Sequence, residues 1–245
     1  MTKRALITGG AKGIGLAIGR RVSRDGIALT LLARDRAALE RAARELDATF
    51  EVADVTDPDA LTAAIHSAGP FDILINNAGG ATSAPFLETT PHDWQAMLSL
   101  NLSSTLAAIH AALPHMLDRG WGRIVNIAST AGLKGYPYTA AYAASKHAVI
   151  GATRSLAIEF ARTGVTINAV CPGFTDTDLV ARAAQTIAAR TVRSDVSARA
   201  DLARYNPQGR LVAPEEVAEA VAFLCSDAAS AMTGQSIAVA GGEVM

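Results

Sequence analysis

Two side chains with complementary proton chemistry, Tyr142 and Lys146, stand four residues apart in the second half of the chain. In a helix this spacing places both on one face, where a lysine cation favours the ionised phenol. A free tyrosine has a pKa of about 10 and exchanges protons poorly at neutral pH, so we expect Lys146 to lower the pKa of Tyr142. The pair indicates proton transfer to or from a reacting oxygen; an ordinary helix-surface pair is the alternative.

A hydroxyl that could assist this transfer lies thirteen residues before Tyr142. Ser129 follows an apolar run over residues 123–128 that we predict to be a strand. From the carboxyl end of that strand, its hydroxyl could bond a substrate oxygen and stabilise the negative charge that develops there. A turn hydroxyl with a backbone partner is the alternative interpretation of Ser129.

The chain begins with a strand–turn–helix pattern whose turn is rich in glycine. An apolar run over residues 4–8 leads into the turn, and a helical pattern follows from Leu16. Glycines let a backbone approach a pyrophosphate closely, and a helix amino terminus presents free N–H groups and a positive dipole end. We therefore predict a dinucleotide site, with a plain tight turn as the alternative. Its predicted residues are Gly9, Lys12, Gly13, Ile14 and Gly15.

The end of the second predicted strand distinguishes between two dinucleotides. An acidic residue there would bond the ribose 2′-hydroxyl of NAD and repel the 2′-phosphate of NADP. Ala33 occupies this position, and Arg34 together with Lys12 could hold a phosphate. We therefore predict NADP(H) as the cofactor. The alternative is that both cations are solvated and Asp35 serves a ribose hydroxyl.

Short runs rich in Val, Ile and Leu alternate with amphipathic segments of helix length. Continuously apolar strands of this kind are typical of a parallel sheet that helices cover on both faces. We predict one α/β domain over residues 1–245, built on a Rossmann-type, doubly wound, seven-stranded parallel sheet with helices on both faces. The predicted strands are residues 4–8, 27–33, 49–53, 71–76, 123–128, 165–171 and 236–240.

Prolines mark the starts of two helices, one from Pro91 to Leu117 and one from Pro214. Residues 178–210 interrupt the alternation of strands and helices. Ligands in such folds bind beyond the carboxyl ends of the strands, so we predict that this segment is a lid over the substrate pocket. It carries six arginines and three acidic residues, an excess that could attract phosphates; solvated helix arginines are the alternative.

The composition argues against several other classes of function. A net charge of −1 favours neither nucleic acid nor an anionic membrane, and two cysteines cannot form a disulfide framework or a four-thiolate metal site. The five histidines show no ligand spacing, so we predict no metal. We also expect no signal peptide and no apolar run of the roughly 18 residues that a spanning helix needs. The expected location is the cytoplasm.

Taken together, these motifs resemble those of the short-chain dehydrogenase/reductase family, and the resemblance covers essentially the whole chain. In order, they are the glycine turn, Asn76-Asn77-Ala78-Gly79, Asn101, Ser129, Tyr142 with Lys146, and Pro172-Gly173. The resemblance implies an oxidoreductase that exchanges a hydride between the nicotinamide of NADP(H) and a ketone/secondary alcohol pair. It also implies that Lys146 bonds the nicotinamide ribose, and that Asn101 helps to hold a water chain leading to Lys146.

Two sets of site residues follow from the motifs and the resemblance. The predicted catalytic residues are Asn101, Ser129, Tyr142 and Lys146. The predicted cofactor-binding residues are Gly9, Lys12, Gly13, Ile14, Gly15, Arg34, Asp54, Val55, Asn77, Ala78, Gly79, Tyr142, Lys146, Pro172, Gly173, Thr175 and Thr177. Asp54 closes the third predicted strand, where it could reach an adenine edge or cap the following turn.

Within the family the chain is most similar to β-ketoacyl thioester reductases, which act on substrates carried by CoA or an acyl carrier protein. The similarity lies in residues 129–132, 138–142, 168–174 and 240–245. We therefore expect reduction of a 3-oxoacyl thioester to the 3-hydroxyacyl thioester, with small cyclic or aromatic ketones as the alternative substrates. The resemblance also implies a homotetramer, whose interfaces involve the Ala-rich helix of residues 140–161 and the last helix and strand.

Two other classes fit the motifs less well. A sugar-nucleotide epimerase or dehydratase shares the glycine turn and the Tyr-x-x-x-Lys spacing, but it needs a further substrate domain for which this chain has little room. A non-catalytic NADP-binding regulator would have lost members of the reactive set, whereas Asn101, Ser129, Tyr142 and Lys146 are all present. We therefore expect an enzyme.

Overall fold

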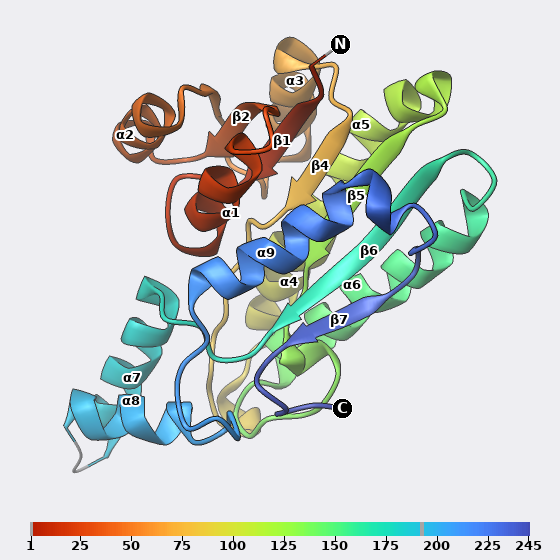
Figure 1. Cartoon of the computed structure of the whole chain (residues 1–245). Helices are drawn as coiled ribbons and strands as arrows, with labels where there is room; N and C mark the ends of the chain where they lie inside the picture. The colour runs from red at the N-terminus through yellow and green to blue at the C-terminus, as the bar shows by residue number, and fades with distance from the viewer. Residues whose placement is uncertain (1, 192–193) are drawn as a thin grey trace.

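Parallel strands form the centre of the computed structural model, which describes residues 2–191 and 194–245. Within these residues, seven strands form one sheet in the order β3-β2-β1-β4-β5-β6-β7 (Figure 1). This confirms the predicted doubly wound fold. The strands are β1 Arg4–Thr8, β2 Ala28–Ala33, β3 Thr49–Val52, β4 Ile73–Asn76, β5 Gly122–Ile127, β6 Val165–Pro172 and β7 Ser236–Val239.

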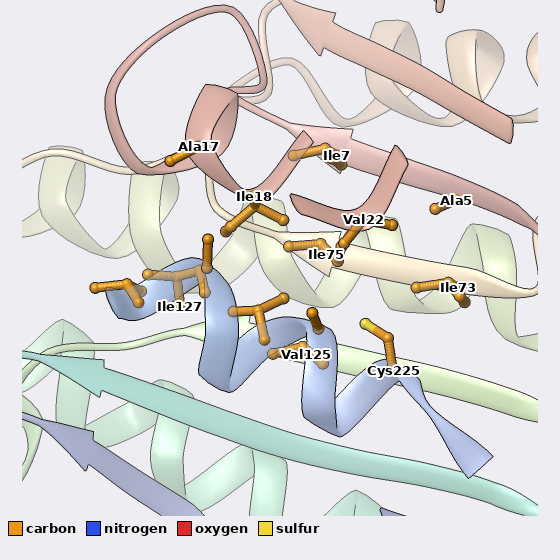
Figure 2. Packing of buried hydrophobic residues seen from close by; sticks show 14 of the residues in the cluster. Ala5, Ile7, Ala17, Ile18, Val22, Ile73, Ile75, Val125, Ile127 and Cys225 are labelled. Atoms are coloured by element: carbon orange, nitrogen blue, oxygen red, sulfur yellow. The ribbon is translucent and has the colours of Figure 1, made fainter. Parts of the chain in front are cut away.

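Successive apolar side chains of each strand enter two different cores, because side chains alternate between the faces of a sheet. On β1, Ile7 packs with residues of α1, α2 and α9, whereas its neighbour Leu6 packs with residues of α3, α5 and α6. Figure 2 shows the first of these cores, where α9 lies against β5 and α1 against β1. The helices are α1 Gly13–Ser23, α2 Arg36–Leu46, α3 Pro58–Ala68, α5 Ser104–Arg119, α6 Ala140–Glu159 and α9 Pro214–Cys225.

The chain is helical from Pro91 to Arg119, which contains the helix predicted from Pro91 to Leu117. It comprises α4 Pro91–Leu98, a π-helical segment Ser99–Ser103, and α5. The expectation that no apolar run is long enough to span a membrane was wrong here, because no charged residue interrupts the segment between Trp94 and Leu117. The core helix of a globular protein passes the same test of length and composition, and α5 packs in the core of this sheet.

The segment predicted to be a lid forms two helices, α7 Asp178–Arg190 and α8 Asp195–Ala203. They lie beyond the carboxyl ends of the strands (Figure 1). Val180 and Ala184 of α7 pack against Ala198 and Leu202 of α8 in a small core of their own. Residues 192 and 193, inside the predicted lid, lie outside the described residues.

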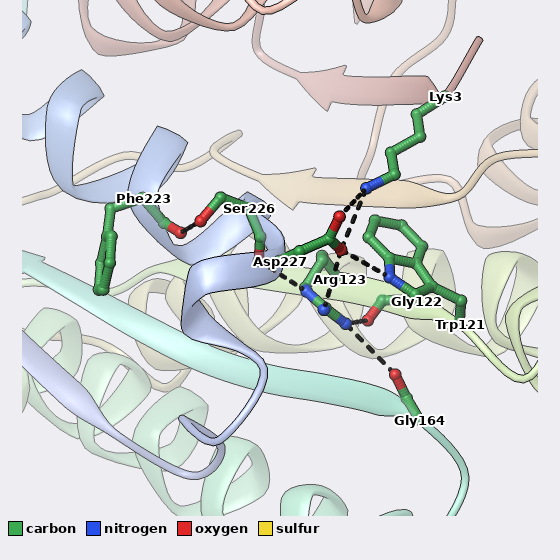
Figure 3. Close-up of polar contacts among 8 residues, drawn as sticks. All are labelled: Lys3, Trp121, Gly122, Arg123, Gly164, Phe223, Ser226 and Asp227. Atoms are coloured by element: carbon green, nitrogen blue, oxygen red, sulfur yellow. Dashed lines mark hydrogen bonds and ion pairs between the residues drawn. The ribbon is translucent and has the colours of Figure 1, made fainter.

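A buried guanidinium joins several elements at the opposite, amino edge of the sheet (Figure 3). The Arg123 side chain of β5 is only 3% exposed. It donates hydrogen bonds to the carbonyl oxygens of Gly122, Gly164 and Ser226, at 2.8–3.2 Å, and lies 3.6 Å from the Asp227 carboxylate. These contacts connect β5 with the start of β6 and the end of α9.

Candidate active site

In the glycine turn between β1 and α1, the backbone at Gly15 passes so close to Gly9 that only glycine fits there. A Cβ atom added at Gly15 would lie 2.3 Å from the carbonyl oxygen of Gly9 and 2.6 Å from Nδ2 of Asn77. Gly9 and Gly13 have positive φ angles of 64° and 55°, which side-chain-bearing residues rarely adopt. The turn therefore needs glycine at these positions to keep its tight path against Asn77.

The amino terminus of α1 has the charge character that a pyrophosphate requires. Lys12, the residue that precedes the helix, makes no side-chain cap, and the first turn contains no acidic residue. By contrast, α2 and α3 are capped by the carboxylates of Asp35 and Asp57. The positive end of the α1 dipole is thus not compensated by the chain itself, and its residues fit a dinucleotide phosphate.

Asn77 supports this turn from β4 rather than presenting its amide to a ligand. Its Nδ2 donates to the carbonyl oxygens of Thr8 and Gly9, at 3.0 and 3.1 Å. The backbone N–H groups of Asn77 and Ala78 both donate to the Thr8 hydroxyl, each at 3.0 Å. Thr8, which the sequence analysis did not select, therefore helps to hold the two strand ends together.

The end of β2 carries the residues predicted to select the cofactor. Ala33 ends the strand, and the Arg34 side chain that follows is 73% exposed, with Nη1 3.3 Å from Oδ2 of Asp54. Asp54 also accepts hydrogen bonds from the N–H and hydroxyl of Thr56, which lower its pKa. Asp54 thus caps a turn, which is one of its two predicted roles, and Asp35 caps α2.

Ser129 and Tyr142 meet at the carboxyl edge of β5. Ser129 lies two residues after the strand and Tyr142 in the first turn of α6. The Ser129 side chain lies near the Tyr142 phenol and acts to lower its pKa. Lys146, on the next turn of the same helix face, is 5% exposed and its Nζ donates to the carbonyl oxygen of Ile127 at 2.9 Å. The fold thus brings together the three residues that the spacing singled out.

Burial controls the protonation of this set. It raises the pKa of Tyr142, and the Ser129 hydroxyl only partly counteracts it. Burial also lowers the pKa of Lys146 from 10.5 to about 8. The net shift of the Tyr142 pKa is therefore upward, whereas the spacing to Lys146 predicted a downward one, because removal from water dominates while Nζ lies 5.9 Å from the centre of the phenol ring.

Asn101 lies in the π-helical segment between α4 and α5 and is 1% exposed. Its side chain donates to the carbonyl oxygen of Gly80 and accepts from the Gly80 N–H, at 3.1 and 3.2 Å. A Cβ atom at Gly79 would lie 2.8 Å from Oδ1 of Asn101 and 3.4 Å from Nζ of Lys146. Asn101, Gly79 and Lys146 are therefore close neighbours, and the Asn101 side chain holds the loop after β4.

The loop after β6, which was predicted to line the nicotinamide half of the cofactor site, reaches the glycine turn. Thr177 lies next to Gly13, where an added Cβ would be 3.5 Å from its Cγ2. Thr175 is buried and donates to the carbonyl oxygen of Gly173 at 2.9 Å. Gly173 follows Pro172, the last residue of β6. This loop could therefore face the nicotinamide half of a dinucleotide laid along the edge.

A cavity of about 170 Å³ is lined in part by the residues that precede Tyr142 in the chain. It lies between the loop of residues 82–84 after β4 and the segment 138–141 that immediately precedes Tyr142. A larger cavity of about 620 Å³ lies at the amino edge, lined by Lys3, Arg21 and Asp227 among others. None of the four predicted catalytic residues lines either cavity, but the smaller one adjoins the segment that leads into Tyr142.

The sheet order, the open amino terminus of α1 and the Ser129–Tyr142–Lys146 arrangement are those of a dinucleotide-dependent oxidoreductase. A family model described as enoyl-(acyl carrier protein) reductase matches residues 9–243. The chain belongs to the short-chain dehydrogenase/reductase family and is an oxidoreductase.

Proteins with known names are similar to this chain over almost its full length. A ketoacyl reductase of Streptomyces coelicolor is 39% identical, over 97% of this chain and 95% of that protein. The 2-(S)-hydroxypropyl-CoM dehydrogenase 3 of Xanthobacter autotrophicus is 42% identical, over 96% and 94%. Among solved structures, a variant of actinorhodin polyketide ketoreductase with NADPH is 37% identical and covers 99% of this chain and 97% of its own, with a TM-score of 0.93.

Proposed function

We propose that this oxidoreductase uses NADPH to reduce the ketone of a 3-oxoacyl thioester to the 3-hydroxyacyl thioester. The bound nicotinamide would supply the hydride. The observation that carries the proposal is the pair of hydroxyls on Ser129 and Tyr142, adjacent to the buried amine of Lys146. A carbonyl oxygen placed between the two hydroxyls would accept a hydrogen bond from each.

In this mechanism Tyr142 gives its proton to the carbonyl oxygen as negative charge develops there. Its raised pKa favours the protonated phenol at neutral pH, which is the form that an acid requires. Ser129 stabilises the same oxygen through its hydroxyl. Lys146 would bond the nicotinamide ribose, and its charge would stabilise the phenolate that remains after transfer. Asn101 contributes by holding the loop that lies against Lys146.

The choice of NADP(H) rests on the end of β2. No carboxylate occupies position 33, and the exposed cations of Arg34 and Lys12 flank the edge that a ribose would reach. The actinorhodin ketoreductase, with which this chain shares 37% identity, is described with NADPH. Asp54 is a competing partner for Arg34, but the pair is exposed, and exposed ion pairs contribute only about 0–1 kcal/mol.

The proposal of a thioester substrate is supported by the relatives rather than by the arginines of residues 178–210. In the structure, three of those arginines are paired with carboxylates: Arg199 with Asp176, Arg204 with Asp201, and Arg210 with Glu216, at 2.6–3.1 Å. Arg193 lies outside the described residues. The local positive charge is therefore smaller than the sequence suggested. Support comes from the similarity to a ketoacyl reductase. The 2-(S)-hydroxypropyl-CoM dehydrogenase, whose named substrate carries an alkyl group rather than an acyl group on sulfur, supports only the secondary alcohol/ketone chemistry.

A substrate panel tests the proposal. NADPH oxidation would be followed at neutral pH with acetoacetyl-CoA, cyclohexanone and acetophenone, with NADH as the matched control for the cofactor. We expect the fastest turnover with acetoacetyl-CoA and NADPH. Selective turnover of the free ketones would replace the thioester with the alternative substrate class, and a preference for NADH would refute the argument from Arg34 and Lys12.

We also propose that α7 and α8 cover the bound substrate, and that four copies of the chain assemble. Exposed apolar side chains support the assembly: Leu106 on α5, Ile158 on α6 and Phe223 on α9 are 38%, 80% and 45% exposed. Light scattering during size exclusion should give a mass about four times the 25.3 kDa of one chain. A mass of one chain would contradict the assembly.

A further inference from the structure

The segment that follows β7 places a carboxylate in a buried position near the active site. The Glu243 side chain is 1% exposed. Its Oε1 accepts a hydrogen bond from the Tyr136 hydroxyl and lies 3.2 Å from Nζ of Lys134. Its Oε2 has no hydrogen-bond partner among the described residues and lies against Gly173, where an added Cβ would be 2.9 Å away.

A charged group in such a position is costly unless it is paired and hydrogen-bonded. Glu243 nevertheless lies two residues before Met245, in a segment that closely contacts other parts of the chain. Gly241 has a φ of 59°, and a Cβ there would lie 1.9 Å from Oδ1 of Asn206, just after α8. Figure 1 shows this end of the chain at the edge of the sheet where α7 and α8 lie.

The partner of Glu243, Tyr136, lies in the segment that connects Ser129 with Tyr142. Its hydroxyl contacts the Thr130 hydroxyl at 2.6 Å, and its carbonyl oxygen accepts from the Thr139 hydroxyl at 3.0 Å. Thr130 follows Ser129 directly, and Thr139 immediately precedes α6. Tyr136 therefore contacts both ends of the segment that separates the two proposed catalytic hydroxyls.

The same ring also contacts the substrate side of the molecule. Tyr136 packs edge-to-face against Phe174 of the loop after β6 and against Tyr205, with ring centres 5.7 and 5.6 Å apart. Lys134 lies 4.9 Å from the centre of the Tyr136 ring. A shift of Tyr136 would therefore move the loop next to Ser129 and the aromatic side chains that connect it to the segment after α8.

We propose that Glu243 is a positioning residue: acting through Tyr136, it fixes the segment 130–139 and thereby the relative positions of the Ser129 and Tyr142 hydroxyls. The inference rests on the proposed function of those two hydroxyls. Burial and the Glu243 carboxylate raise the pKa of Tyr136 far above 10, so Tyr136 keeps its proton and donates a hydrogen bond to Glu243. The Thr130 hydroxyl can then donate to the Tyr136 oxygen, and all three groups are connected.

Three variants test this connection. Glu243→Gln retains the shape of the side chain and removes its charge, Tyr136→Phe retains the ring and removes the hydroxyl, and the third variant combines both. Glu215→Gln, an exposed glutamate on α9, is the matched control. Because a small displacement of reacting groups costs one to two orders of magnitude in rate, we expect each single variant to lower kcat about tenfold. The kcat of the double variant should be no lower than that of either single variant, because both changes break the same series of contacts from Glu243 through Tyr136 to Thr130.

Other measurements separate positioning from general destabilisation. The melting temperature and the Kd for NADPH of both single variants should match those of Glu215→Gln and the unmodified protein. Amide hydrogen exchange, which needs no turnover, should increase over residues 130–139 in both single variants and remain unchanged in the control.

Several outcomes would overturn the inference. Unchanged kcat or unchanged exchange over residues 130–139 in Glu243→Gln would do so, as would losses of kcat that multiply in the double variant. The proposed function fails separately, if Tyr142→Phe retains full activity while the three variants behave as described.

Discussion

The protonation of Tyr142 decides which direction of the reaction the residue serves at neutral pH. A phenol with a raised pKa holds its proton, and reduction of a ketone consumes that proton in the transition state. The oxidation of an alcohol needs the phenolate instead, so the raised pKa of Tyr142 supports the proposed reduction. The Ser129 hydroxyl, which opposes the effect of burial on Tyr142, is also placed to stabilise the substrate oxygen.

Lys146 gives this site a pH dependence. Burial lowers its pKa from 10.5 to about 8, so the charged form, to which we assign the bond to the ribose and the support of Tyr142, is present below pH 8 and is lost as pH rises through it. We expect kcat/KM for NADPH to be highest below pH 8 and to decrease above it. A profile measured at saturating ketone should show this descending limb; a flat profile up to pH 10 would contradict the assigned role.

Residue spacing predicted the Ser129–Tyr142–Lys146 set, but it could not show how neighbouring side chains are used. Asn101 and Asn77 were predicted as site residues, and in the structure their amides bond backbone groups of the loops after β4 and β1. Glu243 and Tyr136 were missed as a pair because they are 107 residues apart and their contact depends on the path of the chain after β7.

At the scale of elements, the strand predictions were accurate because each strand is a short, continuously apolar run. Most boundaries agree within one or two residues; for example, residues 165–171 were predicted and β6 is Val165–Pro172. The helix from Pro91 was predicted as one piece, and its π-helical segment left no signal in the apolar periodicity. That segment places Asn101 beside Gly80, and it could not be inferred from spacing.

The close packing of β1, α1 and the residue after β4 leads to a specific prediction for the glycine turn between β1 and α1. In Gly15→Ala the new methyl group would lie 2.3 Å from the Gly9 carbonyl oxygen, so the turn must shift and NADPH binding should weaken at least tenfold. Gly135→Ala is the control, because nothing lies within 4 Å of a Cβ there. Fluorescence titration with NADPH measures both; equal Kd values would contradict the assignment of the turn.

At the scale of the whole molecule, chemistry and stabilisation occupy opposite edges of the sheet. The proposed catalytic residues lie at the carboxyl edge, whereas the buried guanidinium of Arg123 joins β5, β6 and α9 at the amino edge (Figure 3). The order of strands follows from crossover rules and matches the doubly wound prediction. That the segment predicted as a lid consists of two helices, α7 and α8, could be learned only from the structure.

Arg123 allows stability to be tested apart from catalysis. Arg123→Met leaves three carbonyl oxygens without their buried donor, so the free energy of unfolding should fall by about 2–4 kcal/mol. Arg41→Met, an exposed position on α2, should change it by less than about 0.5 kcal/mol. Urea denaturation at one protein concentration compares the two; similar values would show that the Arg123 contacts contribute little.

The central claim is that the Tyr142 hydroxyl transfers the proton. Its most direct test is NADPH oxidation by Tyr142→Phe, measured with the best ketone of the panel and accompanied by a titration with NADPH. We expect turnover to fall by about 10²–10⁴-fold while the Kd for NADPH stays within about twofold, because only the hydroxyl is removed. Full turnover in this variant would contradict the mechanism.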